Sequence, residues 1–184
     1  MNRAIAKFEK VSFEQFFKDM MDTFGMLDNT IEETYKNIKL PKRATTGSAG
    51  YDFFSPVDFK LKPGETIKIP TGIRCLMDKN WVLQIYPRSG LGFKYRFQLD
   101  NTVGIIDSDY SNSDNEGLIF IKITNDTKVK YDDYAADIGK MPRRTIEIKR
   151  GEAFAQGIFL PYGITVDDDA DGIRNGGFGS TTGM

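Results

Sequence analysis

Residues 81–87, Trp-Val-Leu-Gln-Ile-Tyr-Pro, and residues 117–125, Gly-Leu-Ile-Phe-Ile-Lys-Ile-Thr-Asn, decide the fold class. In both stretches one set of side chains alternates with another at a period of two, which is typical of strands with two different faces. Ile119, Ile121 and Ile123, for example, occupy every second position. We therefore expect both stretches to be β-strands that turn one apolar face toward a core.

Further short β-rich runs occur on either side of these two stretches, and Gly, Pro, Asn and Asp residues separate them. Many short strands at such spacing predict a sandwich, barrel or jelly roll. No alternation of strands with helices is visible, which disfavours a parallel nucleotide-binding sheet. The sequence thus predicts one all-β domain over residues 35–172. Its further runs are VDFKL (57–61), ETIKIP (65–70), GIRCLM (72–77), RTIEIK (144–149) and AFAQGIFLPYG (153–163).

An N-terminal helical extension is expected over residues 1–34. Within residues 12–24, Phe and Met side chains recur at spacings of three and four, which predicts an amphipathic helix. Ser12 and Gln15 form a capping-box pair, and Gly25 supplies a stop. Such an apolar stripe can dock a partner protein, but packing on its own domain or on a neighbouring subunit is the more common use, and we expect packing.

The composition excludes several classes of function. The 184 residues carry 25 Lys and Arg against 26 Asp and Glu, so no basic field is available to hold nucleic acid or an anionic membrane. No signal peptide or membrane-spanning run is visible. The single cysteine, Cys75, lies in an apolar run and fits a reducing compartment. We expect a cytoplasmic protein without nucleic-acid or membrane partners.

Histidine is absent from the chain, which removes whole groups of mechanisms. Ser-His-Asp and Cys-His catalysis and His-ligated zinc sites are excluded. Acid–base chemistry must then depend on carboxylates, Lys, Tyr or metal-bound water.

Three polar stretches are expected to lie at the surface. Residues 111–116 are wholly polar, and residues 126–144 are charged and weakly periodic, so both are interpreted as solvated loops or short hairpins. The acidic run at residues 167–171 is interpreted as a hydrated linker, because consecutive carboxylates point in different directions and do not form a cation site.

Five segments contain more Gly, Asp, Arg, Ser and Gln than a β-domain needs for folding. Each one alone is consistent with an ordinary turn or tail. Together and in this order they resemble the five motifs of the trimeric dUTP pyrophosphatase family, and the resemblance extends from about Ile38 to the C-terminus. The segments are SAGYDFF (48–54), PRSGLGFK (87–94), NTVGIIDSDY (101–110), GEAFAQGIF (151–159) and RNGGFGSTTG (174–183).

The resemblance implies hydrolysis of dUTP to dUMP and pyrophosphate with Mg²⁺, which limits uracil in DNA and supplies dUMP for dTMP synthesis. It also implies a jelly-roll-like, distorted β-barrel and a homotrimer whose active sites are shared between subunits. The Gly-rich tail, residues 173–184, is expected to be mobile and to close over a neighbouring active site.

The third motif is expected to hold the attacking water and the nucleoside. By resemblance, Asp107 activates a water for in-line attack on the α-phosphate. Asp109 is interpreted as a turn cap. A hairpin presents its backbone to uracil, and Tyr110 lies under the sugar, where it leaves no room for a 2′-hydroxyl. The implied hairpin residues are Asn101, Gly104, Ile105 and Ile106.

The remaining motifs are expected to hold the triphosphate. Because its charge is high, it needs hydrogen-bond donors and a divalent cation. Mg²⁺ prefers phosphate oxygens and water, so no direct protein ligand is expected, and Asp52 is expected to order a metal-bound water or its own motif. Phe178 is expected to stack over uracil. The implied phosphate-contacting residues are Arg88, Ser89, Gly90, Gln156, Arg174, Gly179, Ser180 and Thr181.

The chain departs from the family pattern at three places. Ser111 and Asn112 stand where Arg-Gly is common after the tyrosine of the third motif, and a longer polar turn follows. Ala153 replaces a basic residue in the fourth motif. Arg174 lies nearer to Phe178 than in many members.

Two other functions remain open at this stage. One is dCTP deaminase, including the bifunctional deaminase and dUTPase, which shares the fold. Its catalytic glutamate position is occupied here by Lys122, which disfavours deamination. The other is a regulatory homologue that captures a partner protein through the helix or the 126–144 insertion.

Overall fold

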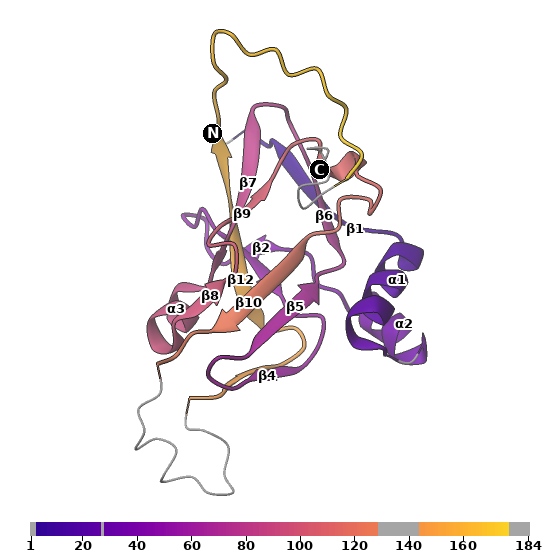
Figure 1. Ribbon diagram of the computed structural model, residues 1–184, viewed down its shortest axis with the longest axis vertical. Coiled ribbons are helices and arrows are strands. Elements are labelled where there is room, and N and C mark those ends of the chain that lie inside the picture. Colours follow the sequence, from indigo (N-terminus) through magenta and orange to yellow (C-terminus); the bar gives the residue numbers. More distant parts are fainter. Residues whose placement is uncertain (1–2, 27, 129–143, 177–184) are drawn as a thin grey trace, which may run out of the picture.

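The computed structural model of the protein describes residues 3–26, 28–128 and 144–176. Strands dominate it, and helices are few and short (Figure 1). In chain order the elements are β1 (Ala6–Lys10), α1 (Phe13–Phe24), α2 (Asp28–Lys36), β2 (Lys42–Arg43), β3 (Tyr51–Phe54), β4 (Phe59–Leu61), β5 (Thr66–Pro70), β6 (Ile73–Met77), β7 (Trp81–Pro87), α3 (Ser89–Tyr95), β8 (Phe97–Leu99), β9 (Gly104–Ile106), the 3₁₀-helix η1 (Tyr110–Asn112), β10 (Phe120–Asn125), β11 (Ile146–Ile148) and β12 (Ala153–Pro161).

The strands form antiparallel ladders within the described residues. The largest sheet has the order β2-β3-β12-β7-β9, and a second has the order β5-β10-β8. Two further pairs, β1-β6 and β11-β4, complete the arrangement (Figure 1). This jelly-roll-like architecture confirms the predicted all-β fold class, and all the β-rich runs found in the sequence form strands.

The core follows from the alternation in the sequence. Ile119, Ile121 and Ile123 are at most 1% exposed, whereas the intervening Lys122 reaches solvent. Leu83 and Ile85 of β7 are buried in the same core. Alternate burial of this kind stabilises a sheet on one face and leaves the other free to carry function.

Helix α1 packs on its own chain, as the sequence analysis predicts. Phe16 and Met20 are buried against Ile31 of α2 and against Leu118, which precedes β10. Gly25 ends the helix in the left-handed conformation, with φ of 58°. The extension is therefore an integral part of the fold.

The capping box at the start of α1 is only half formed. Ser12 Oγ accepts a hydrogen bond from Gln15 N at 3.1 Å, as predicted. The Gln15 side chain, however, donates to Asp19 Oδ2 and leaves the Ser12 N–H to the Glu116 carboxylate at 2.7 Å. A residue distant in sequence thus replaces the local partner that the motif predicts.

Several short elements were not predicted from the sequence. Strand β1 lies within the extension expected to be helical, and its Phe8 packs against Tyr51, Phe53 and Phe159. Helices α2 and α3 are short and rich in polar residues or glycine, so their periodicity is weak. Helix α2 packs through Ile31 against the preceding α1, and α3 contacts the strand β8 that follows it.

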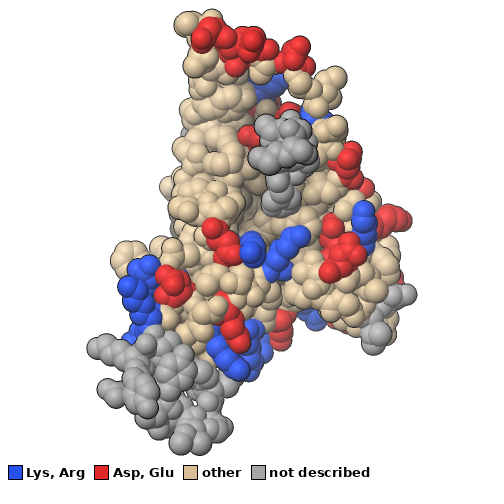
Figure 2. Space-filling model, in the orientation of Figure 1, with Lys and Arg blue, Asp and Glu red and all other residues tan. Residues whose placement is uncertain are grey.

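The acidic run lies at the surface, whereas residues 111–116 are not wholly solvated, because Ser113 is buried and Asn115 and Glu116 are only partly exposed. Residues 162–173 arch away from the sheets (Figure 1), and acidic side chains gather at the tip of this arch (Figure 2). Most of the 126–144 insertion lies outside the described residues. Its two ends are held by Thr127 Oγ1, which donates to Tyr95 O at 2.6 Å, and by Asn125 Nδ2, which donates to Arg144 O at 2.9 Å.

Candidate active site

Three motifs meet where β3, β12 and β7 lie side by side. In the ladder register, Gln156 of β12 is opposite Asp52 of β3 on one side and Tyr86 of β7 on the other. Arg88 Nε lies 3.3 Å from Asp52 Oδ1, and Gln156 Nε2 donates to Pro87 O at 3.2 Å. We call Asp52, Arg88 and Gln156 the arginine cluster.

Gly50 permits the close packing of this cluster. A Cβ at position 50 would come within 2.9 Å of Gln156 Oε1, so any larger residue would displace the amide. The glycine of the first motif is therefore explained by a contact with the fourth.

The second motif places hydrogen-bond donors beside the arginine cluster. Arg88 is the N-cap of α3 and makes no side-chain capping bond, and its side chain is 45% exposed. The first turn of a helix has N–H groups without intrahelical acceptors, and here Ser89 and Gly90 form that turn. An open depression of about 620 Å³ lies beside them, and its lining comprises Arg88, Ser89, Gly90, Leu91, Glu147, Ile148, Glu152 and Ala153.

The hairpin predicted over residues 101–106 does not form a paired two-stranded ladder, because the preceding β8 pairs with β10 whereas β9 pairs with β7. These residues form a tight turn that leads into β9, and the name hairpin is kept for residues 101–106. Strand β9 pairs with β7, so that Gly104 lies opposite Ile85. A Cβ at Gly104 would lie 3.1 Å from Ile85 Cβ, so the glycine keeps the strand closely packed. Val103 N donates to Asn101 O at 2.7 Å, which closes the tip. Ile105 is half exposed, whereas Ile106 is buried, so the hairpin is fixed on one face and open on the other.

Arg174 binds both aspartates of the third motif. Its Nη2 lies 2.5 Å from Asp107 Oδ2, and its Nε lies 2.7 Å from Asp109 Oδ1. The guanidinium is also 5.9 Å from the centre of the Tyr110 ring. We call Asp107, Asp109, Tyr110 and Arg174 the aspartate cluster. Arg174 is thus paired with carboxylates of its own chain, a contact that the sequence does not predict.

Tyr110 is the most deeply buried member of the aspartate cluster. It is 8% exposed, its hydroxyl donates to Leu118 O at 3.1 Å, and Asn115 Nδ2 donates to the same hydroxyl at 3.0 Å. Burial raises the pKa of the Tyr110 phenol, so the group stays neutral at physiological pH. A neutral, buried ring can select a ligand by steric fit and not by charge.

The two clusters lie at opposite ends of β7 in one chain. Asp107 follows Ile106, which pairs with Leu83, whereas Arg88 follows Pro87 at the other end of the strand. At about 3.4 Å per strand residue, the two ends are separated by roughly 20 Å. One copy therefore does not bring the Asp107 carboxylate to the phosphate donors of the second motif.

The last motif is only partly described. Arg174 belongs to the described residues, and Ser113 Oγ donates to Gly176 O at 3.4 Å just beyond it. The predicted uracil-stacking and phosphate-contacting residues Phe178, Gly179, Ser180 and Thr181 lie outside the described part of the chain.

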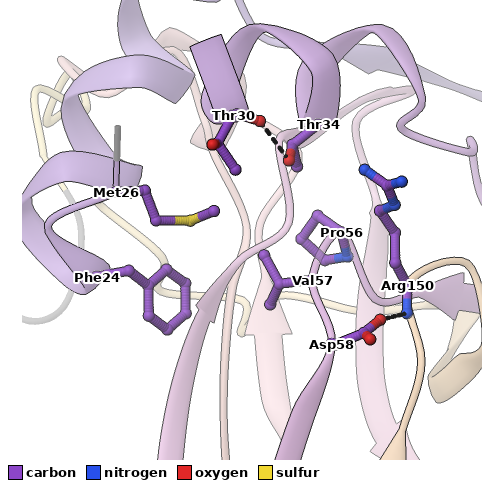
Figure 3. Close-up of a pocket in the computed structure, with 8 residues that line it drawn as sticks. All are labelled: Phe24, Met26, Thr30, Thr34, Pro56, Val57, Asp58 and Arg150. Carbon is purple, nitrogen blue, oxygen red and sulfur yellow. Dashed lines mark hydrogen bonds between the residues drawn. The ribbon is translucent and has the colours of Figure 1, made fainter. Parts of the chain in front are cut away.

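A separate hollow lies between the helical extension and the sheets (Figure 3). It measures about 460 Å³, and its described lining contains none of the predicted site residues. The Thr34 hydroxyl donates to Thr30 O within it, and Arg150 N donates to Asp58 Oδ1. Neither cluster opens into it, and it is smaller than the depression of about 620 Å³ beside Arg88.

Two absences apply to the described residues. Residues 3–26, 28–128 and 144–176 contain no group of three His, Cys, Asp or Glu side chains placed to hold a metal ion. Within the same ranges no helix is long and apolar enough to span a membrane. Cys75 is buried, and its burial raises the thiol pKa to about 12, so the thiol is not a nucleophile at neutral pH.

Comparison with known proteins agrees with this geometry. A family model described as dUTPase matches residues 36–135. The deoxyuridine 5′-triphosphate nucleotidohydrolase of Lactococcus lactis is 38% identical over 152 residues, covering 80% of this chain and 91% of the relative.

Solved structures show the same fold. The crystal structure of dUTPase from Streptococcus mutans has a TM-score of 0.57 at 29% identity, covering 86% of this chain and 97% of that chain. A point mutant of the dUTPase from phage phi11 of Staphylococcus aureus, described with a structural Mg(II) ion, has a TM-score of 0.60 at 18% identity, covering 92% and 98%. The latter likeness shows the fold alone.

Proposed function

The chain belongs to the dUTPase family, and from that premise we propose that it hydrolyses dUTP to dUMP and pyrophosphate. One observation carries the proposal. Strands β3, β7 and β12 gather three of the family's motifs into the arginine cluster beside an open depression, as triphosphate binding requires. The reaction limits uracil in DNA and supplies dUMP for dTMP synthesis.

Arg88 and the first turn of α3 bind the phosphates. A guanidinium and backbone N–H groups are suited to phosphate oxygens, and Gln156 adds an amide at the same edge. The Asp52 carboxylate pairs with the Arg88 guanidinium at 3.3 Å, which limits the orientations that the guanidinium can take.

Mg²⁺ is the cofactor of the family, and the residues fit its use with a triphosphate. Hard divalent cations take phosphate oxygens and waters readily, so binding needs no protein cage. When bound, the ion neutralises phosphate charge and favours departure of pyrophosphate. Asp52, which pairs with Arg88, would order a metal-bound water there.

The third motif holds the nucleoside and the attacking water. The open face of the hairpin, with Asn101 at its tip and the close approach allowed by Gly104, presents backbone groups to uracil. Tyr110 lies beneath deoxyribose. Asp107 orients and deprotonates the water that attacks the α-phosphorus, and the P–O bond to pyrophosphate breaks in line with it.

Arg174 must leave Asp107 for this step, because its guanidinium lies 2.5 Å from the Asp107 Oδ2 atom and occupies the position that the attacking water would take. The γ-phosphate competes with Asp107 for Arg174. When Arg174 binds this phosphate, Gly179, Ser180 and Thr181 of the tail bind it as well. Phe178 then stacks over uracil. Substrate binding and release of the base are thereby coupled.

The separation of the two clusters supports a homotrimer with shared sites. Since Asp107 and Arg88 lie at opposite ends of β7, a second copy must supply one of them. We place the protein in the cytoplasm, where its single buried thiol stays reduced, and we assign it no nucleic-acid or membrane partner.

Two alternatives have less support. In dCTP deaminases the position of Lys122 carries a catalytic glutamate, and here the Lys122 ammonium is paired with Asp100 Oδ2 at 2.9 Å. A purely regulatory homologue has no need for the arginine cluster, although a second, partner-binding role is compatible with it.

Nucleotide specificity tests the proposal. With Mg²⁺, the protein should release pyrophosphate from dUTP far faster than from dCTP or dTTP, and dCTP should yield no ammonia. Ammonia release from dCTP at a rate comparable to dUTP turnover would establish the deaminase instead, and absence of turnover would favour the regulatory homologue.

A further inference from the structure

Two parts of the chain that the family pattern does not explain meet in the structure. Residues 111–117, here called the 111–117 turn, replace the family's Arg-Gly, and α1 lies outside the resemblance. The Glu116 carboxylate accepts hydrogen bonds from Ser12 N at 2.7 Å and from Ser12 Oγ at 2.6 Å. The turn thus caps the N-terminus of α1 from a distance of 104 residues in sequence.

The other side of the same turn holds Tyr110. Asn115 Nδ2 donates to the Tyr110 hydroxyl at 3.0 Å and also lies 3.3 Å from Leu118 O, which accepts the phenol proton. Asn115 Oδ1 accepts from Gly117 N at 3.1 Å. The hydroxyl of Tyr110 is therefore fixed by the turn and by the residue that follows it.

The backbone of the turn is held in a conformation that ordinary residues avoid. Glu116 has φ of 57° and Gly117 has φ of 74°. A Cβ at Gly117 would lie 2.5 Å from Ser111 Cα and 2.8 Å from Tyr110 O. A left-handed glutamate persists where surrounding contacts determine it, and such positions are common at functional sites. Here the two bonds from Ser12 hold the side chain, and Glu116 N donates to Ser113 O at 2.8 Å within the turn.

Leu118 provides a second connection between α1 and Tyr110. Its side chain is fully buried in the cluster that contains Phe16 and Met20 of α1. Its carbonyl accepts the Tyr110 hydroxyl. Two routes thus connect the phenol to α1. One runs through Asn115 and the neighbouring Glu116, which binds Ser12, and the other runs through Leu118, which packs on Phe16 and Met20.

We propose that Glu116 and Asn115 are positioning residues that fix the Tyr110 ring against the N-terminal helix and thereby set the discrimination of deoxyribose from ribose. The inference rests on the proposed function, in which Tyr110 lies beneath the sugar. A ring that excludes one hydroxyl by contact must be held within a fraction of an ångström, and neighbouring contacts provide that precision. The N-terminal extension and the 111–117 turn then act together as a specificity element.

A double-mutant cycle tests this coupling. Glu116→Asn suits the left-handed conformation but is too short and uncharged to hold Ser12. The ratio of kcat/KM for dUTP to that for UTP should fall about tenfold in Glu116→Asn and by less in Ser12→Ala. The double variant should show the same ratio as Glu116→Asn alone, because both changes remove one contact. Turnover of dUTP itself should change little, because neither residue touches the nucleotide.

Gly25→Ala is the matched control for destabilisation of α1. It strains the left-handed C-cap at the opposite end, where an added methyl meets nothing within 4 Å, and leaves the Ser12–Glu116 contact intact. Its melting temperature should fall while the dUTP to UTP ratio stays at the wild-type value. An equal loss of selectivity in Gly25→Ala would overturn the proposal, because general loosening would then explain the effect.

The wild type and Tyr110→Ala separate failure of this inference from failure of the proposed function. Wild-type protein without a preference for dUTP over UTP would overturn the proposed function. A second outcome would overturn only the positioning role. In that outcome the wild type and Glu116→Asn both prefer dUTP over UTP, whereas Tyr110→Ala has lost the preference; the proposed function would then stand.

Discussion

The two ends of β7 differ in how their functional side chains are held. At the Pro87 end, Arg88 is 45% exposed and is restrained by one ion pair beside an open depression. At the Trp81 end, Tyr110 is 8% exposed and held by two hydrogen bonds. Binding phosphate charge tolerates a mobile side chain, whereas excluding a hydroxyl does not. The same strand therefore carries an open arginine at one end, here called the adaptable end, and a tightly held tyrosine at the other, here called the rigid end, where the neighbouring Asp107 is 48% exposed.

Replacing the base at the rigid end should have the largest effect. Asp107→Asn keeps the size of the side chain but removes the proton acceptor, so turnover should fall by roughly 10²–10⁴-fold while dUTP still binds. Single-turnover pyrophosphate release and a separate binding titration would measure the two quantities. Asp109→Asn, which removes the other partner of Arg174, serves as the control and should lose much less. Near-normal turnover in Asp107→Asn would overturn its role.

At the adaptable end, Arg88→Ala should weaken use of the triphosphate. Loss of a charge-assisted contact of roughly 1.5–3 kcal/mol predicts a fall of about 10- to 150-fold in kcat/KM for dUTP. Arg96→Ala removes a comparably exposed arginine that pairs with Asp126 away from the cluster, and it should retain activity. Equal losses in both variants would show that net charge, and not the position of Arg88, is what matters.

The hairpin between the two ends should be sensitive to one methyl group. Gly104→Ala brings a Cβ to 3.1 Å from Ile85 Cβ, so β9 must shift and the base-contacting face moves with it. We expect KM for dUTP to rise about tenfold, a change typical of a misplaced contact. Gly47→Ala, where the added methyl meets nothing within 4 Å, is the control. Unchanged kinetics in Gly104→Ala would show that the hairpin tolerates displacement.

The smallest expected effect is on the pH dependence of stability, through the Glu116 carboxylate that supports the rigid end. Hydrogen bonds from the Ser12 hydroxyl and backbone N–H lower the pKa of Glu116 from its ordinary value of 4.5. A lowered folded-state pKa stabilises the protein above pH 4.5, and this contribution is lost as the pH falls through the folded value. Since the carboxylate is partly exposed, solvent screening limits the stabilisation to under about 1 kcal/mol.

Glu116→Gln should therefore melt a few degrees below the wild type at pH 7, and the gap should narrow below pH 4.5. Melting curves across this range would measure the gap. Glu65→Gln is a matched control, because Glu65 Oε2 likewise accepts a backbone N–H but does so from Lys62 within its own turn. A gap that widens in acid would contradict the assignment of the Glu116 contact.

Local sequence patterns predicted the strands and the first helix, because side-chain alternation and caps are short-range signals. Ile121 and Phe16 are buried as expected. Strand β1 was not predicted, since its place depends on pairing with β6. The order of the motifs predicted the site residues through resemblance alone, and the structure adds how Asp52, Arg88 and Gln156 come together.

Contacts distant in sequence account for what was not predicted at the site. Arg174 meets Asp107 from 67 residues away, and Glu116 meets Ser12 from 104 residues away. Neither side-chain periodicity nor turn-forming residues predict such pairs. The reduced spacing between Arg174 and Phe178 and the unusual Asn-Glu-Gly at residues 115–117 were the available signals, and both mark departures from the family pattern.

Subunit complementation tests most directly whether the two ends of β7 from different copies form one site. Asp107→Asn and Arg88→Ala chains, each of low activity, are unfolded, mixed in equal amounts and refolded together. With shared sites, random assembly gives about one quarter of the sites both intact groups, so activity should return to roughly that fraction of wild type. Activity that stays at the mean of the two separate variants would contradict the shared site.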